Sequence, residues 1–471
     1  MEGGYYGALS LLPIILALVL AFITKDAILA LFIGCIVGVI ILGQDPATGL
    51  SKLFQAALGN ADFIWVLMIE VFIGILIAFF LKAGVTQGFA DIVSKKVRTR
   101  RSAQVTAWLL GMFVFFSDYF SPLFTGTIMR PVTDRMKVSR EKLAYLLDST
   151  SAPVCTLIPI SGWAVYVAGL LANVGGPISS KEVGLSVFIN SIPYNFYGLI
   201  AVALAGLIAA GIIPDFGPMK RAEKRAIETG KVLRDGATPL VGVELEKISP
   251  KEGKKGNVIL HLIVPVLIIV CIAVGTFIAL GSTKILEAFI AATLYLAIIL
   301  WIQGYFNGIK DMVDTALNGV KGVLPAITIL ALAYSINTVT KALGGPEFVL
   351  SITRGWMTPA LLVGITFVTG ALISFFSGTS WGTYAILTPF VIPLALELSN
   401  GTLGPLVYAA TAAIVGGGVF GDHCSPVSDT TILSSFGSAC DHMDHVITQM
   451  PYALTAALLA LILYLIVGVI L

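Results

Sequence analysis

The stretch that decides the fold of this chain is Asp422-His423-Cys424-Ser425-Pro426-Val427-Ser428-Asp429, which lies inside a long apolar run. A similar string, Asp148-Ser149-Thr150-Ser151-Ala152-Pro153-Val154, lies in another apolar run far upstream. Carboxylates and helix-breaking residues are costly at membrane depth, because backbone groups freed from a helix cannot bond to water there. The two strings therefore predict an all-α polytopic membrane protein with a binding site between broken helices.

Each string is preceded by a matching partner, Phe115-Phe116-Ser117-Asp118 in the first case and Phe375-Phe376-Ser377-Gly378-Thr379-Ser380 in the second. The order of the two motifs is the same in both parts of the chain. This repetition predicts two related halves that contribute to one site.

The composition agrees with a multi-pass protein of the lipid bilayer. Hydrophobic residues make up 57% of the chain and charged residues 12%, against about 25% charged residues in ordinary soluble domains. The formal net charge of +2 suggests no nucleic-acid partner, and the five scattered cysteines suggest no disulfide framework.

The apolar runs long enough to cross a bilayer core of roughly 30 Å form two sets of five. The first half holds runs near 8–24, 27–43, 63–81, 143–170 and 186–213, and the second near 258–280, 284–303, 322–343, 405–440 and 450–471. The polar segment 215–257 between them, with ten Lys/Arg and seven Asp/Glu, is predicted to be a solvated cytoplasmic linker.

Two further stretches are predicted to be re-entrant hairpins. Residues 103–129 are interrupted by polar residues and flanked on both sides by basic segments, and positive residues stay on the cytoplasmic side. Both ends then face the same side, so the stretch dips in and returns. Residues 362–398, broken near 377–382 and poor in flanking positive charge, are expected to enter from outside.

This topology gives each half five spans and one hairpin, and it places both chain termini outside. An odd number of crossings per half makes 1–214 and 258–471 inverted repeats, the plan of many secondary transporters. The loop 441–449, placed inside, has no Lys or Arg and does not support the assignment.

The broken helices predict two cation sites, because freed carbonyls and side-chain oxygens are the ligands that hard cations such as Na+ prefer. Bonding of a hydroxyl to its own helix is the alternative for the Ser and Thr residues, but it does not explain the aspartates. The first site comprises Ser117, Asp118, Asp148, Ser149 and Thr150, and its inverted partner comprises Ser377, Gly378, Thr379, Ser380, Asp422 and Ser425.

Four other polar residues are candidates for proton or substrate contacts. Asp429, which follows Ser428, either contacts the ion or caps the helix that restarts there. His423 either shares a proton with Asp422 or is its structural partner. Glu70, in an apolar helix, is either a proton carrier or the acceptor of a buried hydrogen bond.

Several motifs are assigned no catalytic role. His442 and His445 share a helix face but have no second ligand group with zinc spacing, so a helix end facing the cytoplasm is expected there. Gly416-Gly417-Gly418 predicts close helix packing. The chain has neither a phosphate-binding G-x-x-x-x-G-K-[ST] string nor an HExxH zinc motif, and it is expected to be no enzyme and to use no cofactor.

The run Gly421–Ser435 closely resembles the signature of the NhaC family of bacterial and archaeal sodium/proton antiporters. Cys440–Tyr452 resembles the continuation of that signature, and Arg130–Arg135 with Asp148–Val154 resembles its first-half counterpart. The resemblance implies the ion-transporter superfamily fold in a bacterial or archaeal cell membrane, with a homodimeric scaffold and mobile transport domains that contain paired hairpins. The best-defined antiporter branch has Lys-Met where this chain has His423-Cys424.

The leading hypothesis is exchange of Na+ for H+ by alternating access. Asp148 and Asp422 would bind either ion, and the transport domain would cross only when their charge is masked. The rival is Na+-coupled symport of an amino acid or small organic acid, that is, a zwitterionic or anionic solute. Its pocket would be lined by the aromatic residues near the breaks, which are Trp163, Tyr166, Trp381 and Tyr384.

Overall fold

The computed structural model describes the chain except for residues 1–3, 25, 95, 116, 160, 242–244, 246, 281–283, 357 and 359. The described part is helical, with two isolated β-bridges and no strand. In the first half the helices are α1 Leu12–Thr24, α2 Ala27–Ile41, α3 Pro46–Leu58, α4 Ala61–Ala83, α5 Val85–Ser94, α6 Arg100–Phe113, α7 Phe120–Arg135, α8 Arg140–Ser149, α9 Ala152–Cys155, α10 Gly162–Ala172, α11 Lys181–Ser191 and α12 Phe196–Ala209.

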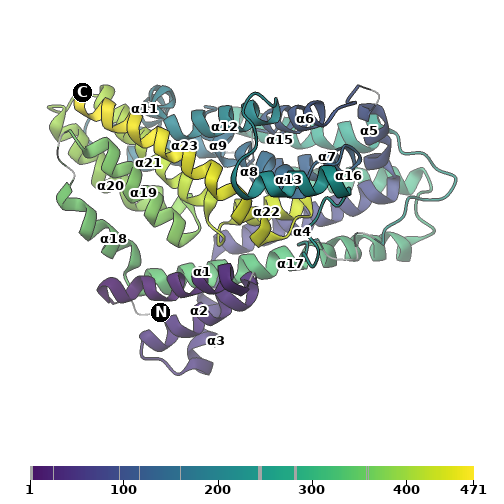
Figure 1. Cartoon of the computed structure of the whole chain (residues 1–471), viewed down its shortest axis with the longest axis horizontal. Coiled ribbons are helices and arrows are strands. Elements are labelled where there is room, and N and C mark those ends of the chain that lie inside the picture. The colour runs from purple at the N-terminus through teal and green to yellow at the C-terminus, as the bar shows by residue number, and fades with distance from the viewer. Residues whose placement is uncertain are drawn as a thin grey trace.

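The remaining helices run to the carboxyl terminus (Figure 1). They are α13 Gly217–Thr229, α15 Val264–Leu280, α16 Ile285–Ile302, α17 Ile309–Ala342, α18 Gly345–Thr353, α19 Leu362–Ser377, α20 Ser380–Leu398, α21 Pro405–Cys424, α22 Asp429–Ser438 and α23 His442–Ile470.

Seven of the described helices are long and apolar enough to cross a membrane, and two bent helix pairs raise the number to nine. This is fewer than the ten crossings expected. The run 143–170 is divided into α8, α9 and α10, because its polar residues interrupt the helix between 150 and 161. The first apolar run gives a helix shorter than a span. The chain is a multi-pass membrane protein.

The helix breaks in the two predicted hairpins lie where the sequence places them. α6 ends at Phe113 and α7 begins at Phe120, although residue 116 lies outside the described residues. α19 ends at Ser377 and is capped by Gly378, whose φ of +66° is left-handed and favours glycine. A Cβ on Gly378 would also lie 2.4 Å from the carbonyl oxygen of Val427, so the hairpin tip packs directly on the break between α21 and α22.

The segment 215–257 is docked on the helix bundle, which corrects the expectation of a purely solvated linker. Its helix α13 contacts α8 and α23. Arg225 pairs with Glu141 at 2.9 Å, and Arg234 pairs with Asp444 at 2.8 Å. The hydrogen bonds that Arg234 donates to the carboxylate of Asp444 raise the pKa of Arg234, which keeps the guanidinium charged. The segment therefore attaches to helices from both halves of the chain.

The long helix α17 forms one side of the molecule together with α2, α3 and α4. In Figure 1 it runs along the lower edge beside α1, while α19, α20, α21 and α23 lie above it. Close crossing of α17 and α4 depends on two glycines, since a Cβ on Gly319 would lie 2.4 Å from the carbonyl oxygen of Gly74. Helices α4 and α17 therefore form a closely packed wall opposite the broken helices.

The glycine run in α21 packs closely, as the sequence predicts. A Cβ on Gly417 would lie 2.4 Å from the carbonyl oxygen of Phe367 in α19, and one on Gly418 would lie 2.4 Å from the ring of Tyr384 in α20. A Cβ on Gly421 would lie 2.5 Å from the carbonyl oxygen of Ala371. Asp422 is thereby held against the hairpin formed by α19 and α20.

We expect Gly417→Ala to lower thermal stability, because the added methyl group meets backbone that cannot move aside, and overpacking costs about 1–3 kcal/mol. The measurement is thermal unfolding of the detergent-purified protein. Gly275→Ala in α15 is the matched control, since a Cβ there has no atom within 4 Å. Equal melting temperatures for the two variants would contradict the close packing of α19 and α21.

Candidate functional site

The breaks in the two halves meet in the protein interior. Asp148 ends the last turn of α8 and Asp422 lies near the end of α21, and both are buried, with 0% and 1% exposure. Ser149 Oγ lies 3.1 Å from His423 Nε2. Gln449 Nε2 donates to Asp148 Oδ2 at 2.7 Å and also to the carbonyl of His423. These contacts join the two aspartate strings through α23.

Asp422 lies in a cluster of oxygen atoms. Ser380, at the start of α20, donates to Asp422 Oδ2 at 2.7 Å, and Ser428 donates to Oδ1. Thr430 Oγ1 lies 3.1 Å from Ser428 Oγ, and Thr431 Oγ1 donates to the carbonyl of Asp422 at 3.2 Å. A carboxylate surrounded by hydroxyls from a hairpin tip and a helix break is the kind of donor set that suits a hard cation.

The neighbouring predicted residues shape this cluster and form no side-chain hydrogen bond with the Asp422 carboxylate among the described residues. Ser425 donates to the carbonyl of Phe375 at 2.7 Å, and this bond fixes the break against α19. Ser377 donates to the carbonyl of Thr379 at 3.3 Å across the hairpin tip. Ser377, Gly378 and Thr379 line a cavity beside the cluster.

Asp148 has a different environment. Its Oδ2 accepts from Gln449 and lies 3.7 Å from His445 Nε2, while its Oδ1 has no hydrogen-bond partner among the described residues. Behind it, Ser435 Oγ lies 2.8 Å from His445 Nδ1 and 3.0 Å from His442 Nδ1. Both imidazoles are buried at the start of α23, the helix end expected there.

The residues grouped in the first predicted site separate into two places. Ser117 accepts from the backbone N–H of Phe120 at 3.2 Å and so supports the start of α7. Thr150 donates to the carbonyl of Leu146 at 2.8 Å, which is the local alternative for a hydroxyl. Ser149 instead contacts His423, and Asp118 lies towards Asp429 rather than Asp148.

Asp429 faces the cavity instead of capping α22. The cap is Ser428, whose Oγ accepts from the N–H of Thr431 at 3.4 Å. Asp429 Oδ2 accepts from the hydroxyl of Tyr119 at 2.8 Å, which joins the first hairpin to the second break. Asp429 is close enough to interact electrostatically with Glu70 and Asp118.

Glu70 and Asp118 are buried, and their surroundings leave carboxyl oxygens without a hydrogen-bond partner in the described part of the chain. Both oxygens of Glu70 and Oδ2 of Asp118 are such atoms. Glu70 therefore does not form the buried hydrogen bond, expected as its alternative role, with any described residue. His423, in contrast, has partners on both nitrogens, Ser149 and Tyr197, the latter at 2.7 Å from Nδ1.

These carboxyl groups share one electrostatic property. The salt bridges among the described residues pair none of them with Lys or Arg, and only Asp148 has a histidine nitrogen within ion-pair distance, that of His445 at 3.7 Å. A buried carboxylate without a compensating cation is costly, by several kcal/mol per ion. Each group must therefore be protonated or hold a cation. The members of this carboxyl set are Glu70, Asp118, Asp148, Asp422 and Asp429.

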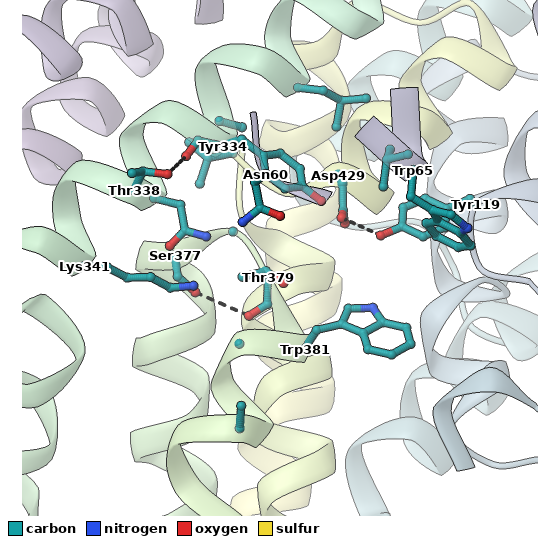
Figure 2. Close-up of a pocket in the computed structure, with 18 of the residues that line it drawn as sticks. Asn60, Trp65, Tyr119, Tyr334, Thr338, Lys341, Ser377, Thr379, Trp381 and Asp429 are labelled. Atoms are coloured by element: carbon teal, nitrogen blue, oxygen red, sulfur yellow. Dashed lines mark hydrogen bonds between the residues drawn. The ribbon is translucent and has the colours of Figure 1, made fainter. Parts of the chain in front are cut away.

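A cavity of about 820 Å³ separates the wall of α17 and α4 from the broken helices (Figure 2). Tyr166 and Trp381, two of the aromatic residues singled out in the sequence, line it. The other two lie behind them: the ring of Trp163 is 4.4 Å from that of Trp381 and 5.5 Å from that of Tyr384. The lining also includes Asp429.

Sequence reasoning missed several residues of the site. Tyr334, Asn337, Thr338 and Lys341 line the cavity from α17. Their spacing of i, i+3, i+4 and i+7 puts them on one helix face, and this polar stripe within an apolar run was a usable signal. Gln449 gave no such signal, because only the folded chain brings it to Asp148.

The described residues contain no group of three or more His, Cys, Asp or Glu side chains arranged to hold a metal ion. His442 and His445 bond to Ser435, and His442 Nε2 lies 2.8 Å from the carbonyl of Pro426. A cation at the Asp422 cluster would thus be held by one carboxylate and by hydroxyl oxygens.

Residues 154–469 match the model of the Na+/H+ antiporter family. The chain belongs to the Na+/H+ antiporter family. It is therefore a secondary transporter, and Na+ and H+ are the ions that the family carries. The match includes the Asp422 cluster, α23 with Gln449 and the cavity-lining face of α17.

Individual relatives agree with this family. The chain is 31% identical to an uncharacterised Haemophilus influenzae protein, over 98% of this chain and 90% of that one. It is 29% identical to the malate-2H(+)/Na(+)-lactate antiporter of Bacillus subtilis, over 43% of this chain and 44% of the relative. It is 26% identical to the Na(+)/H(+) antiporter NhaC of Alkalihalophilus pseudofirmus, over 34% of each.

We expect Ser380→Ala to weaken Na+ binding by on the order of tenfold, because the carboxylate of Asp422 loses a charge-assisted hydrogen bond and the cation loses an oxygen ligand. The measurement is the Na+ concentration that half-saturates transport in proteoliposomes. Ser399→Ala, at the other end of α20, is the control, since Ser399 Oγ donates only to the carbonyl of Ala395 in its own helix. Equal Na+ affinity in both variants would remove Ser380 from the ion site.

Proposed function

We propose that this antiporter-family protein exchanges Na+ for H+ across a bacterial or archaeal cell membrane by alternating access, with Asp422 and Asp148 as the groups that bind the two ions. The observation that carries the proposal is the burial of both carboxyl groups without a Lys or Arg partner among the described residues. Burial makes the bare anion unfavourable, so each group is occupied by a proton or by Na+.

Exchange follows from this restriction. If the mobile part of the protein crosses only when its carboxyl groups are neutralised, it returns with a proton after it has carried Na+, and with Na+ after it has carried a proton. A proton gradient then drives Na+ the other way. Transport requires no covalent chemistry, and the remaining residues have to hold ions and exclude water.

The two carboxyl groups are suited to different tasks. Asp422 has the hydroxyls of Ser380 and Ser428 as neighbours, and we assign Na+ to this cluster. Asp148 has the amide of Gln449 at 2.7 Å and the imidazole of His445 at 3.7 Å beside it, with the hydroxyls of Thr431 and Ser434 also close by. We assign the proton to Asp148, with His445 as the neighbour able to exchange it.

The architecture that we propose consists of inverted repeats over 1–214 and 258–471. In support, each hairpin pair, α6 with α7 and α19 with α20, is followed by a helix that breaks at an aspartate string, α8 and α21. In this proposal the hairpins and breaks form the transport domain, α4 and α17 belong to the scaffold, and two scaffolds associate in a homodimer.

The second candidate function is Na+-coupled symport of a small organic solute. The observation in its favour is the size of the cavity, since ion exchange by itself needs no chamber of 820 Å³. The relative named for malate, protons and lactate also handles carboxylic acids together with Na+. Solute-dependent Na+ entry without proton movement would favour symport, whereas Na+-dependent proton movement in the absence of solute favours exchange.

Asp148→Asn and Asp422→Asn should each abolish Na+-dependent proton release, because an amide neither binds a proton at neutral pH nor attracts Na+. The assay is a pH-sensitive dye inside proteoliposomes after addition of Na+. Glu287→Gln, at an exposed acid at the start of α16, is the control and should retain exchange. Near-normal exchange in both Asn variants would refute the assignment.

Exchange should also respond to pH with a defined sign. Because the carboxylate must lose its proton before it binds Na+, lower pH raises the Na+ concentration needed for half-saturation, by up to about tenfold per pH unit. At higher pH, protons compete less with Na+ for the carboxylate, until the supply of protons limits the rate of exchange. A half-saturating Na+ concentration that does not vary with pH would show that protons do not compete with Na+ for the Asp422 carboxylate.

A further inference from the structure

We infer that His442, Ser435 and His445 form a path that carries protons between the start of α23 and Asp148. The inference rests on the proposed function, because it takes Asp148 as the group that carries the transported proton. It adds a role for Ser435 and His442, to which the proposed function assigns none.

The partners of His445 decide which of its nitrogens bears a hydrogen. Gln449 Nε2 donates to Asp148 Oδ2 at 2.7 Å and to the carbonyl of His423, which can only accept. The amide oxygen of Gln449 therefore faces the other way and lies 2.9 Å from His445 Nε2. An oxygen acceptor requires a donor, so Nε2 of His445 bears a hydrogen. In the neutral ring, Nδ1 is then an acceptor.

The same reasoning applies to His442. Its Nε2 lies 2.8 Å from the carbonyl of Pro426, so this nitrogen also bears a hydrogen. Both neutral rings then turn an unprotonated Nδ1 towards one atom, Ser435 Oγ, at 2.8 Å from His445 and 3.0 Å from His442. The same hydroxyl lies 2.9 Å from the carbonyl of Thr431.

This cluster is short of one proton. A hydroxyl has a single hydrogen to donate, whereas Ser435 Oγ faces one carbonyl and two unprotonated imidazole nitrogens. If the hydroxyl donates to one ring, Nδ1 of the other ring faces a lone pair of Ser435 with no hydrogen between them. All three side chains are buried, where an unmet acceptor is costly. A proton added to that nitrogen turns the contact into a hydrogen bond.

The surroundings of the two rings can balance the added charge. Asp148 Oδ2, from α8, lies 3.7 Å from His445 Nε2, so an ionised Asp148 attracts a proton to this path. The other charged and titratable groups that interact with the rings, among the described residues, are His423 on α21 and Asp441 at the start of α23, with Arg234 of the docked segment 3.7 Å from Asp441.

A proton added to His442 can then reach Asp148 in two transfers. The Nδ1 proton of His442 passes to Ser435 Oγ while the hydroxyl hydrogen passes to Nδ1 of His445. The Nε2 hydrogen of His445 then passes to Asp148 Oδ2, once these atoms close from 3.7 Å to the roughly 2.8 Å of a hydrogen bond. One proton has entered and one has arrived, and Ser435 is again a hydroxyl. Transfer in the reverse direction unloads Asp148 and restores the first tautomer of His445.

The test separates proton transfer from ion transport in proteoliposomes. A pH-sensitive dye reports Na+/H+ exchange, and uptake of radioactive Na+ against internal Na+ reports Na+/Na+ exchange, which moves no proton. Ser435→Ala removes the bridging hydroxyl, and His442→Gln keeps a donor for the carbonyl of Pro426 but has no imidazole to pass a proton on. Each should slow Na+/H+ exchange by about tenfold or more, because a positioned acid–base group is lost. Each should retain Na+/Na+ exchange.

Ser438→Ala is the matched control. Ser438 is buried on the same helix α22, and its hydroxyl donates to the carbonyls of Ser434 and Ser435 in that helix. Both modes of exchange should persist in this variant. A purely structural role of Ser435 or His442 would instead slow the two modes equally, and melting temperatures of the purified variants show whether each one is folded.

Two results would overturn the inference: Ser435→Ala and His442→Gln exchange Na+ for H+ as fast as the wild type, or folded variants lose both modes to the same extent. Should Ser435→Ala not fold, His442→Gln decides by itself. The wild-type protein separates the two proposals. If it moves no proton in exchange for Na+, both proposals fail, whereas normal exchange in the wild type and in both variants overturns only the path through Ser435.

Discussion

The structure depends on one electrostatic constraint, the burial of several carboxyl groups that form no ion pair with a Lys or Arg of the described part of the chain. Asp148 and Asp422 are the central members, and Glu70, Asp118 and Asp429 surround them. An unpaired buried anion would destabilise the fold, so the folded state requires a proton or a metal cation at these positions. Burial of these carboxyl groups costs free energy when the chain folds. The same burial makes the occupancy of the site sensitive to both ions.

The rest of the architecture holds these groups in place. The glycines of α21 allow α19 to approach closely, and this contact brings the hairpin tip with Ser380 to Asp422. Gln449, on α23, bonds to both aspartate strings and so fixes one half against the other. Uninterrupted helices could not form these contacts. The backbone groups inside a helix are already bonded to one another, and the radius of each helix sets how closely its side chains can approach a neighbour.

The helical class, the positions of the breaks and the close packing of the glycine run could be predicted from the sequence because each depends on local chemistry. The antiporter family could be predicted because Gly421–Ser435 resembles the signature of that family. Polar residues in an apolar run mark a break wherever the chain folds. The grouping of Asp118 with Asp148 could not be judged from the sequence around either residue. Asp118 lies towards Asp429, which is about three hundred positions away in the chain. The role of Gln449 likewise depends on helix packing, and the docking of α13 depends on ion pairs between distant segments.

That docking has a mechanical consequence. Arg225 ties α13 to Glu141 on α8, and Arg234 ties the same segment to Asp444 on α23, one turn before Gln449. The helices that carry Asp148 and its amide donor Gln449 are therefore also joined to each other through this segment. A movement that separated α8 from α23 would have to break these ion pairs as well as the hydrogen bond from Gln449 to Asp148.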